Sequence, residues 1–494
     1  MWLRRYRCEV VVFCVLVFSF AYFQHSAPGW NVNSRFALTL ALGETGSAEV
    51  SRYAGRPGLE TMDLAEYEGR VYSDKSLGTS LLGVPALWAV KAMEAAAGTT
   101  FPLATKRWLV TALSVGVTGA VAGVLLMRWL MVIGAGASAT RLRAACIVLA
   151  GLPGSLLYLY GTLFMSYLPA TCFLVAMLLL VEHGLRCESG RRKCVLLLLA
   201  GLCGGLTVLC EYTYGAAAVL VGLMVIARLV GQVGVGRAVW PVALFGLGGV
   251  IGILPFFVYT IALFGQPGIP YQYHMMPEFR EAMARGFMGA GAPDWQVLWL
   301  ITFHPYRGLF VYSPLMLMGV LGVVVALVRG GGGLRRAVAG LCLANIVFYL
   351  LFNSAYYMWW GGWSFAPRHL APALPFMLAG VLVWCGRGVA VRWLLGVAAA
   401  VGVAVHVCVN ATEPQLPDGG WQQALLQPDM AQYDYPATFA AQIVPRLAQG
   451  AFDANLGTAV FGLPGGFGSL APLVLVWCAG GVLLWRFGRD DHSA

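Results

Sequence analysis

An acid and a lysine stand side by side where an apolar run begins, in GRVYSDKSLGTSLLGVPALWAV, residues 69–90. Charges are costly at the edge of lipid, so Asp74 and Lys75 are expected to face either headgroups or a pocket at the membrane surface. A lysine can hold a phosphate, and a carboxylate can take a proton from a hydroxyl nucleophile. The pair therefore indicates transfer chemistry on an anionic lipid.

Other ionisable residues lie in three polar, aromatic stretches that separate apolar segments. The candidates for binding such a substrate are Arg35, His274, His304, Arg307, Arg368 and His369. Together with Lys75 they predict a water-facing pocket of cations around one or two carboxylates, in which Lys75, Arg307 and Arg368 hold phosphate. The alternatives stay open: an arginine beside tryptophan could anchor a lipid headgroup, and a histidine could be only an interfacial hydrogen-bond donor.

Three acids are candidates for the catalytic base. Asp63 comes first, because it precedes the YSDK stretch at a spacing that lets it fold back over the same pocket, and Asp74 comes second. Glu211 is third: it ends an apolar segment in LCEYTYG, where an acid needs a partner. A hydrogen bond at the helix end would explain Glu211 equally well.

A divalent metal ion is the one cofactor that the pattern could hold, although no cofactor is required by it. Asp74 and His274 are conceivable ligands. Nothing in their spacing demands a metal.

The composition is that of an integral membrane protein. Of 494 residues, 59% are hydrophobic and 11% are charged, whereas soluble domains have about 25% charged residues. The net charge of +10 does not indicate nucleic-acid binding, because the basic residues stand at the ends of apolar segments. The 12 cysteines show no paired spacing, so neither a disulfide framework nor a zinc site is expected.

Apolar stretches of spanning length predict an all-α polytopic membrane protein with about 12 or 13 transmembrane helices. The stretches are about 8–24, 77–97, 107–130, 140–160, 163–184, 192–210, 212–230, 238–264, 309–328, 335–356, 369–387, 391–410 and 466–486. The basic N-terminus with its apolar core is interpreted as an uncleaved first helix rather than a signal peptide.

The basic clusters between segments predict which loops share a face of the membrane. The clusters are Arg141/Arg143, Arg186 to Lys193, Arg228/Arg237, Arg329 to Arg336, Arg387/Arg392 and Arg486/Arg489. All of them can be cytoplasmic if one early segment fails to cross, and 77–97 is the best candidate for such an interfacial helix. The loops 25–76, 265–308, 353–368 and 411–465 then face outward. The first contains a surface helix near Phe36 to Leu42, and the last is a candidate lid or acceptor-binding segment.

Several motifs resemble one family of membrane enzymes. NVNSRFALTLAL, YSDKSLGTSLLGVP, HPYRGLFVYSPL and YYMWWGGWSFAPRHLAPALPF look like the GT-C glycosyltransferases related to protein mannosyltransferases and to the aminoarabinose transferase of lipid A. The resemblance covers most of residues 1–375, taken as the catalytic region, and leaves 376–494 as C-terminal transmembrane helices. By it, Lys75 matches a lysine that contacts the donor phosphate. Relatives carry an acid shortly before the arginine of the surface helix, and residues 31–35 here contain none.

The resemblance implies a glycosyltransferase in the bacterial cytoplasmic membrane, with its active site on the outer face. It would move a sugar, with inversion, from a polyprenyl-phosphate carrier to an extracytoplasmic acceptor, which could be a glycan, a lipid or a protein. One rival function is that of a secondary transporter or lipid flippase. Such proteins tend to have internal repeats and ionisable residues near the bilayer midplane, whereas this sequence shows no repeat and its charges collect in the outer loops. The other is a non-catalytic scaffold that binds lipid headgroups.

Overall fold

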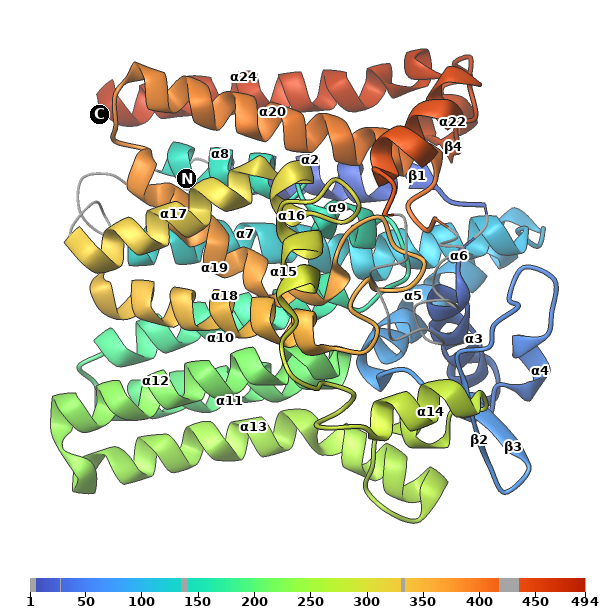
Figure 1. The fold of residues 1–494 in the computed structure, drawn as a ribbon, viewed down its shortest axis with the longest axis horizontal. Helices are drawn as coiled ribbons and strands as arrows, with labels where there is room; N and C mark the ends of the chain where they lie inside the picture. The colour runs from blue at the N-terminus through green and yellow to red at the C-terminus, as the bar shows by residue number, and fades with distance from the viewer. Residues whose placement is uncertain (1–5, 27, 135–140, 330–333, 417–434, 494) are drawn as a thin grey trace.

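The structure, a computed structural model, describes residues 6–26, 28–134, 141–329, 334–416 and 435–493. Long helices run side by side in one bundle, and short helices and hairpins gather beyond one end of it, at the right of Figure 1. The bundle helices are α2 (Arg7–Ala21), α6 (Leu103–Thr111) with α7 (Val117–Ile133), α8 (Arg141–Gly151), α10 (Tyr167–Arg186), α11 (Gly190–Cys210), α12 (Gly215–Val233), α13 (Val235–Phe264), α17 (Pro314–Arg329), α18 (Arg336–Ala355), α19 (Leu374–Val381), α20 (Val389–Thr412) and α24 (Ala471–Ser493). The predicted all-α polytopic class is confirmed.

Eight of the described helices are long and apolar enough to cross a membrane. This is fewer than the predicted 12 or 13, because several apolar stretches form shorter helices. The stretch 140–160 breaks in two: α8 ends at Gly151, and α9 (Leu156–Gly161) begins after a turn. Pro153 and Gly154 explain the break, since the residue before a proline disfavours helical geometry and glycine weakens a helix.

The short elements beyond the end of the bundle at the right of Figure 1, here called the site end, come mainly from three of the four loops that were predicted to face outward, 25–76, 265–308 and 411–465. They are β1 (Phe23–Gln24), α3 (Trp30–Thr45), α4 (Ser51–Ala54), β2 (Leu64–Tyr67), β3 (Arg70–Ser73), α14 (Pro277–Ala284), α15 (Trp295–Thr302), α16 (Leu309–Tyr312), α22 (Val444–Ala448), β4 (Ala454–Asn455) and α23 (Leu456–Ala459). The predicted surface helix is α3. Strand β1 pairs with β4 and so joins the first loop to the last. Residues 417–434 of the predicted lid lie outside the described residues.

Helix α5 (Leu77–Ala97) begins and ends beside the first outer loop. It starts directly after Lys75, and near its other end Glu94 pairs with Lys106 at 3.1 Å. The next residue is Arg107, whose guanidinium donates to the backbone oxygen of Gly58 at 2.9 Å. Helix α5 therefore stays at the site end, as the topology requires of one early segment, and α6 begins the next crossing.

The far end of the bundle gathers arginines from three separate basic clusters around one acid. Glu182, on α10, is buried and pairs with Arg186 at 3.1 Å, with Arg228 at 3.0 Å and with Arg335. These arginines come from α10, α12 and the residue before α18. The three clusters therefore lie on the same face, as the charge pattern predicts.

Glycines let α11 and α13 cross with their backbones in contact. A Cβ at Gly201 would lie 1.9 Å from the oxygen of Phe245, and one at Gly248 would lie 2.0 Å from the oxygen of Leu198. Only glycine permits so close an approach, which is a common way for membrane helices to pack. The contact fixes α11, whose last residues lead into Glu211.

Candidate active site

A tight hairpin brings Asp63 and Asp74 together. Strands β2 and β3 pair so that Leu64 lies opposite Ser73, and the next pair outward would be Asp63 and Asp74. The connection is a two-residue turn in which both Glu68 (φ 51°) and Gly69 (φ 74°) have positive φ, as the favoured hairpin turn requires. The register of this hairpin therefore sets the two carboxylates side by side.

Lys75 lies between the two carboxylates. Its Nζ is 2.8 Å from Oδ2 of Asp63 and 2.9 Å from Oδ2 of Asp74. The ammonium also faces the ring of Tyr271 at 5.6 Å. One cation for two acids leaves the cluster with a net negative charge when both acids are ionised.

The two acids differ in how readily they ionise. Burial alone would raise the pKa of Asp63, but the charge and hydrogen bond of Lys75, with the charge of Arg368, outweigh burial and lower this pKa below its usual value. Burial raises the pKa of Asp74, and the negative charge of Asp63 adds to the rise, although Lys75 opposes it. Asp63 is thus the acid that stays ionised and able to accept a proton.

A second ion pair, between Arg35 and Glu211, lies next to this cluster. The Arg35 Nη2 is 3.3 Å from Oε2 of Glu211, and the same guanidinium donates to Oδ1 of Asn31 at 3.0 Å and to Oγ of Ser76 at 2.8 Å. Glu211 also accepts a hydrogen bond from Ser166. Glu211 therefore has the partner that its apolar surroundings demand, and it stands at the site end next to α3.

His274 approaches the cluster from the large outer loop. Its Nε2 is 3.6 Å from Oδ2 of Asp74, and its Nδ1 accepts a hydrogen bond from the backbone N–H of Met276 at 3.0 Å. Burial lowers the pKa of His274, so the ring is neutral and carries its single proton on Nε2. His274 therefore points an N–H toward Asp74.

Asp63, Asp74 and His274 can each offer one ligand atom within 4.8 Å of the others, the spacing of a metal site. Two observations argue against a divalent ion in this arrangement. The Lys75 ammonium already lies between the carboxylates. A histidine that binds a metal through Nε2 normally donates from Nδ1, but the Nδ1 of His274 accepts from Met276. These residues, as arranged, do not fit the metal site predicted at Asp74 and His274.

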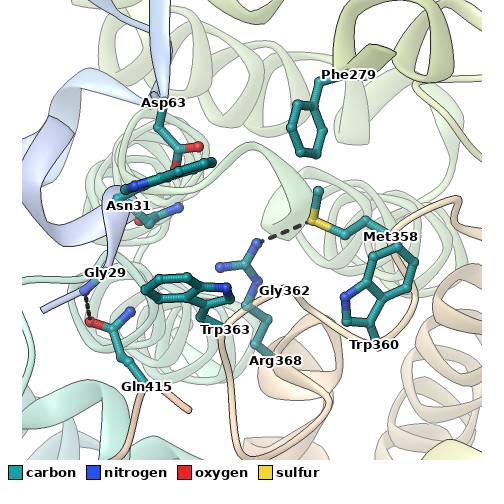
Figure 2. A pocket seen from close by; sticks show the side chains of 11 residues that line it. Gly29, Asn31, Asp63, Phe279, Met358, Trp360, Gly362, Trp363, Arg368 and Gln415 are labelled. Atoms are coloured by element: carbon teal, nitrogen blue, oxygen red, sulfur yellow. Dashed lines mark hydrogen bonds between the residues drawn. The ribbon is translucent and has the colours of Figure 1, made fainter. Parts of the chain in front are cut away.

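Two adjoining pockets open beside the cluster and share Asn31, Asp63, Met358 and Arg368. The first, here called the lysine pocket, is also lined by Arg35, Asp74, Lys75, Ser76, Tyr167, Glu211, Tyr212, Thr213, Ile269, Tyr271, Met283, Met288, Tyr356, Tyr357 and His369. The second, the tryptophan pocket, is also lined by Gly29, Trp30, Phe279, Trp360, Gly362, Trp363 and Gln415, and Figure 2 shows it from close by. Asp63 faces both.

Seven of the ten predicted site residues line the lysine pocket, whereas His274, His304 and Arg307 line neither pocket. The Nδ1 of His304 accepts the backbone N–H of Tyr306, and its ring faces Tyr435. The buried Arg307 donates to the backbone oxygen of Gly362 at 3.4 Å. This contact holds Arg307 against the turn that precedes Trp363. Because Arg307 and His304 line neither pocket, the expected contacts of Arg307 with phosphate and of His304 with substrate are not what this geometry provides.

Sequence reasoning missed several residues of the two pockets. Trp30 and Trp363 gave no signal, because tryptophan is enriched at the membrane interface of membrane proteins in general. Gln415 gave no signal, because it reaches the tryptophan pocket only through its hydrogen bond with the backbone N–H of Gly29 at 2.7 Å. Asn31 lies in the stretch 31–35, where the resembling family carries an acid. That position was the one sequence feature that could have marked Asn31 as a pocket residue.

No protein-family model and no curated protein matches the chain. Among solved structures, the chain is similar to the crystal structure of ArnT from Cupriavidus metallidurans bound to undecaprenyl phosphate. The sequence identity is 15%, the TM-score is 0.50, and the match covers 99% of this chain and 76% of that one. The oligosaccharyltransferase of Archaeoglobus fulgidus in its apo form matches at 13% identity and a TM-score of 0.47, over 88% of this chain and 61% of that one. The likeness to ArnT shows that the chain has a GT-C type fold.

Proposed function

We propose that the chain is a membrane glycosyltransferase that moves a sugar from a polyprenyl-phosphate donor to an acceptor hydroxyl outside the cytoplasm. The observation that carries the proposal is the position of Lys75, which is held between Asp63 and Asp74 at the wall of a pocket that Arg368 also lines. A cation poised beside an ionised acid suits the binding of a phosphate and the activation of a hydroxyl. The fold is one that ArnT, bound to undecaprenyl phosphate, also has.

The lysine pocket has the chemistry to bind the phosphate end of such a donor. Lys75 and Arg368 are its cations nearest to Asp63, and both would stabilise the charge on a phosphate oxygen. Its remaining wall is aromatic and apolar, formed largely by Tyr271, Tyr356, Tyr357, Met283 and Met288. Such a wall would bury the first isoprene units.

The proposed reaction uses Asp63 as general base. The acceptor hydroxyl oxygen attacks the anomeric carbon of the sugar and forms the new glycosidic bond while its proton passes to Asp63. The bond between the anomeric carbon and the phosphate oxygen breaks, and its electron pair leaves with the phosphate. Attack from the face opposite the phosphate inverts the anomeric centre.

Phosphate binding would also free the base. In the described arrangement Lys75 neutralises Asp63. The phosphodiester of the donor carries a negative charge that competes for the same ammonium, so the arriving donor would draw Lys75 away from Asp63. The base would then become available only when a donor is bound. The charge on the leaving phosphate is balanced by Lys75 and Arg368, and no step requires a metal.

The test is release of radiolabelled sugar from a panel of polyprenyl-phosphate sugars by purified protein in nanodiscs. Wild type is expected to release sugar from at least one donor, and Asp63→Asn is expected to lose this activity while still binding undecaprenyl phosphate. Asp294→Asn is the matched control, because Asp294 caps α15 outside both pockets and asparagine can keep that cap.

The rival functions predict different results in the same preparation. A scaffold would bind undecaprenyl phosphate and release sugar from no donor. A flippase would release no sugar either, and in proteoliposomes it would move a fluorescent polyprenyl phosphate between leaflets. Either pattern would overturn the transferase.

A further inference from the structure

The tryptophan pocket has a wall made of two stacked indoles. The rings of Trp30 and Trp363 lie 6.1 Å apart, centroid to centroid, with 25° between their planes. Trp30 begins α3, and Trp363 follows Gly361 and Gly362, whose φ values of 83° and 65° only glycine adopts readily. The glycine pair therefore turns the chain so that Trp363, which is 37% exposed, meets Trp30.

The same pocket contains hydrogen-bonding groups that the described residues leave unused. Trp360 is 2% exposed, and its indole N–H has no hydrogen-bond partner among the described residues. The Nε of Arg368 is likewise buried without a partner in the described part of the chain. Figure 2 shows Arg368 between Trp363 and Trp360, with Asp63 across the pocket. Buried donors without partners are costly, so these groups are expected to meet a ligand.

This combination fits a sugar ring better than a lipid chain or a peptide. One face of a pyranose carries C–H groups that pack on an aromatic ring, while its edge carries hydroxyls that need fixed donors and acceptors. An isoprenoid or acyl chain would leave the Trp360 and Arg368 donors unsatisfied. An extended peptide that binds by strand addition is held through its backbone along a sheet edge. The hairpin edge does not line this pocket.

We propose that the tryptophan pocket is the acceptor site and that the acceptor is a saccharide, which stacks on Trp30 and Trp363 and presents a hydroxyl to Asp63. This inference rests on the proposed transferase function. Asp63 lies where the two pockets meet, so one carboxylate can face both an acceptor hydroxyl and the anomeric carbon of a donor in the lysine pocket. The hydroxyl gains a bond to that carbon, and its proton goes to Asp63 as the phosphate leaves.

The experiment measures acceptor binding and donor binding separately in nanodiscs. Saturation-transfer difference NMR with a panel of methyl glycosides and disaccharides reports saccharide binding without a donor, and undecaprenyl phosphate affinity is measured in parallel. Sugar release is then followed with each saccharide and with peptides that contain serine and threonine. The variants are Trp363→Leu, which removes the stacking surface, and Trp360→Phe, which keeps a ring and removes the N–H. Trp393→Leu is the matched control, because Trp393 is 72% exposed on α20 and lines neither pocket.

At least one saccharide is expected to bind wild type and to accelerate sugar release. Its KM should rise at least tenfold in Trp363→Leu and in Trp360→Phe, with undecaprenyl phosphate affinity unchanged and Trp393→Leu equal to wild type. If peptides alone accelerate release, or if the variants bind the saccharide as wild type does, the acceptor inference is wrong. A wild type that neither binds undecaprenyl phosphate nor releases sugar would instead refute the proposed function.

Discussion

The Nζ of Lys75 lies 2.8 Å from Oδ2 of Asp63, a residue 12 positions earlier in the chain. The contact exists because the β2–β3 hairpin sets Asp63 opposite Asp74, the neighbour of Lys75. Any insertion in the Glu68–Gly69 turn would change this register and separate the acids. The proposed base is therefore positioned by a short hairpin at the membrane surface, next to the lysine proposed to bind the donor.

Substitutions that preserve side-chain shape can decide whether Asp63 or Glu211 is the general base. Asp63→Asn is expected to lower kcat by about 10²–10⁴-fold, the usual contribution of a general base. Glu211→Gln is expected to cost less than about tenfold, because the amide oxygen can still accept from Arg35 and Ser166. Initial rates at saturating donor measure both. A larger loss in Glu211→Gln than in Asp63→Asn would move the base to Glu211.

The acid limb of the pH–rate profile should depend on Lys75 and not on Asp74. The rate falls as pH drops through the pKa of Asp63, because protonated Asp63 cannot accept the hydroxyl proton. Lys75→Met removes a positive charge, which raises that pKa and moves the limb to higher pH. The pKa of Asp74 is raised, so Asp74 is already protonated where Asp63 titrates, and Asp74→Asn is expected to leave the limb in place.

The measurement is kcat/KM across the acid range for wild type and the two variants, with Asp294→Asn as a control for general effects of pH on the protein. An acid limb that does not move in Lys75→Met would show that Asp63 does not set the limb. A limb that vanishes in Asp74→Asn would assign the titrating proton to Asp74.

Removal of divalent metals should leave the activity unchanged. Lys75 occupies the position between the carboxylates, and the hydrogen bond from Met276 keeps the proton of His274 on Nε2. Protein treated with EDTA is therefore expected to release sugar at the untreated rate, and elemental analysis should find no stoichiometric zinc. A stoichiometric metal that is lost in His274→Gln, together with activity, would contradict this reading.

Composition and periodicity were enough to predict the bundle, because a spanning helix needs a long apolar run that is visible in the sequence. They overestimated the number of spanning helices, since 140–160 is mostly apolar after Arg143 and yet Pro153 and Gly154 end the helix early. They also pointed to 77–97 as the best candidate for a segment that does not cross the membrane. The reason was that all the basic clusters can be cytoplasmic only if one early segment fails to cross.

The site could be predicted in part. Ionisable residues beside apolar segments are easy to recognise in a sequence, because charges are costly near lipid. The sequence therefore predicted six charged residues of the lysine pocket: Asp63, Asp74, Lys75, Arg35, Glu211 and Arg368. Arg307 could not be separated from them, because only the fold shows that it contacts the backbone of Gly362 and lines neither pocket. The tryptophan pocket was invisible for the opposite reason: nothing in a sequence distinguishes an interfacial tryptophan from one that is stacked on a partner.

The crossing of α11 and α13 gives a test of the fold that leaves the site untouched. A Cβ at Gly248 would lie 2.0 Å from the oxygen of Leu198 and 2.8 Å from the nitrogen of Leu202, and both atoms belong to a helix backbone that cannot rotate away. Gly248→Ala must therefore push the two helices apart and is expected to destabilise the protein by about 1–3 kcal/mol.

Gly246→Ala is the matched control on the same helix, because a Cβ there meets nothing within 4 Å. Thermal unfolding in detergent should show a lower Tm for Gly248→Ala and no loss for Gly246→Ala. Equal Tm values would mean that α11 and α13 do not cross at these glycines.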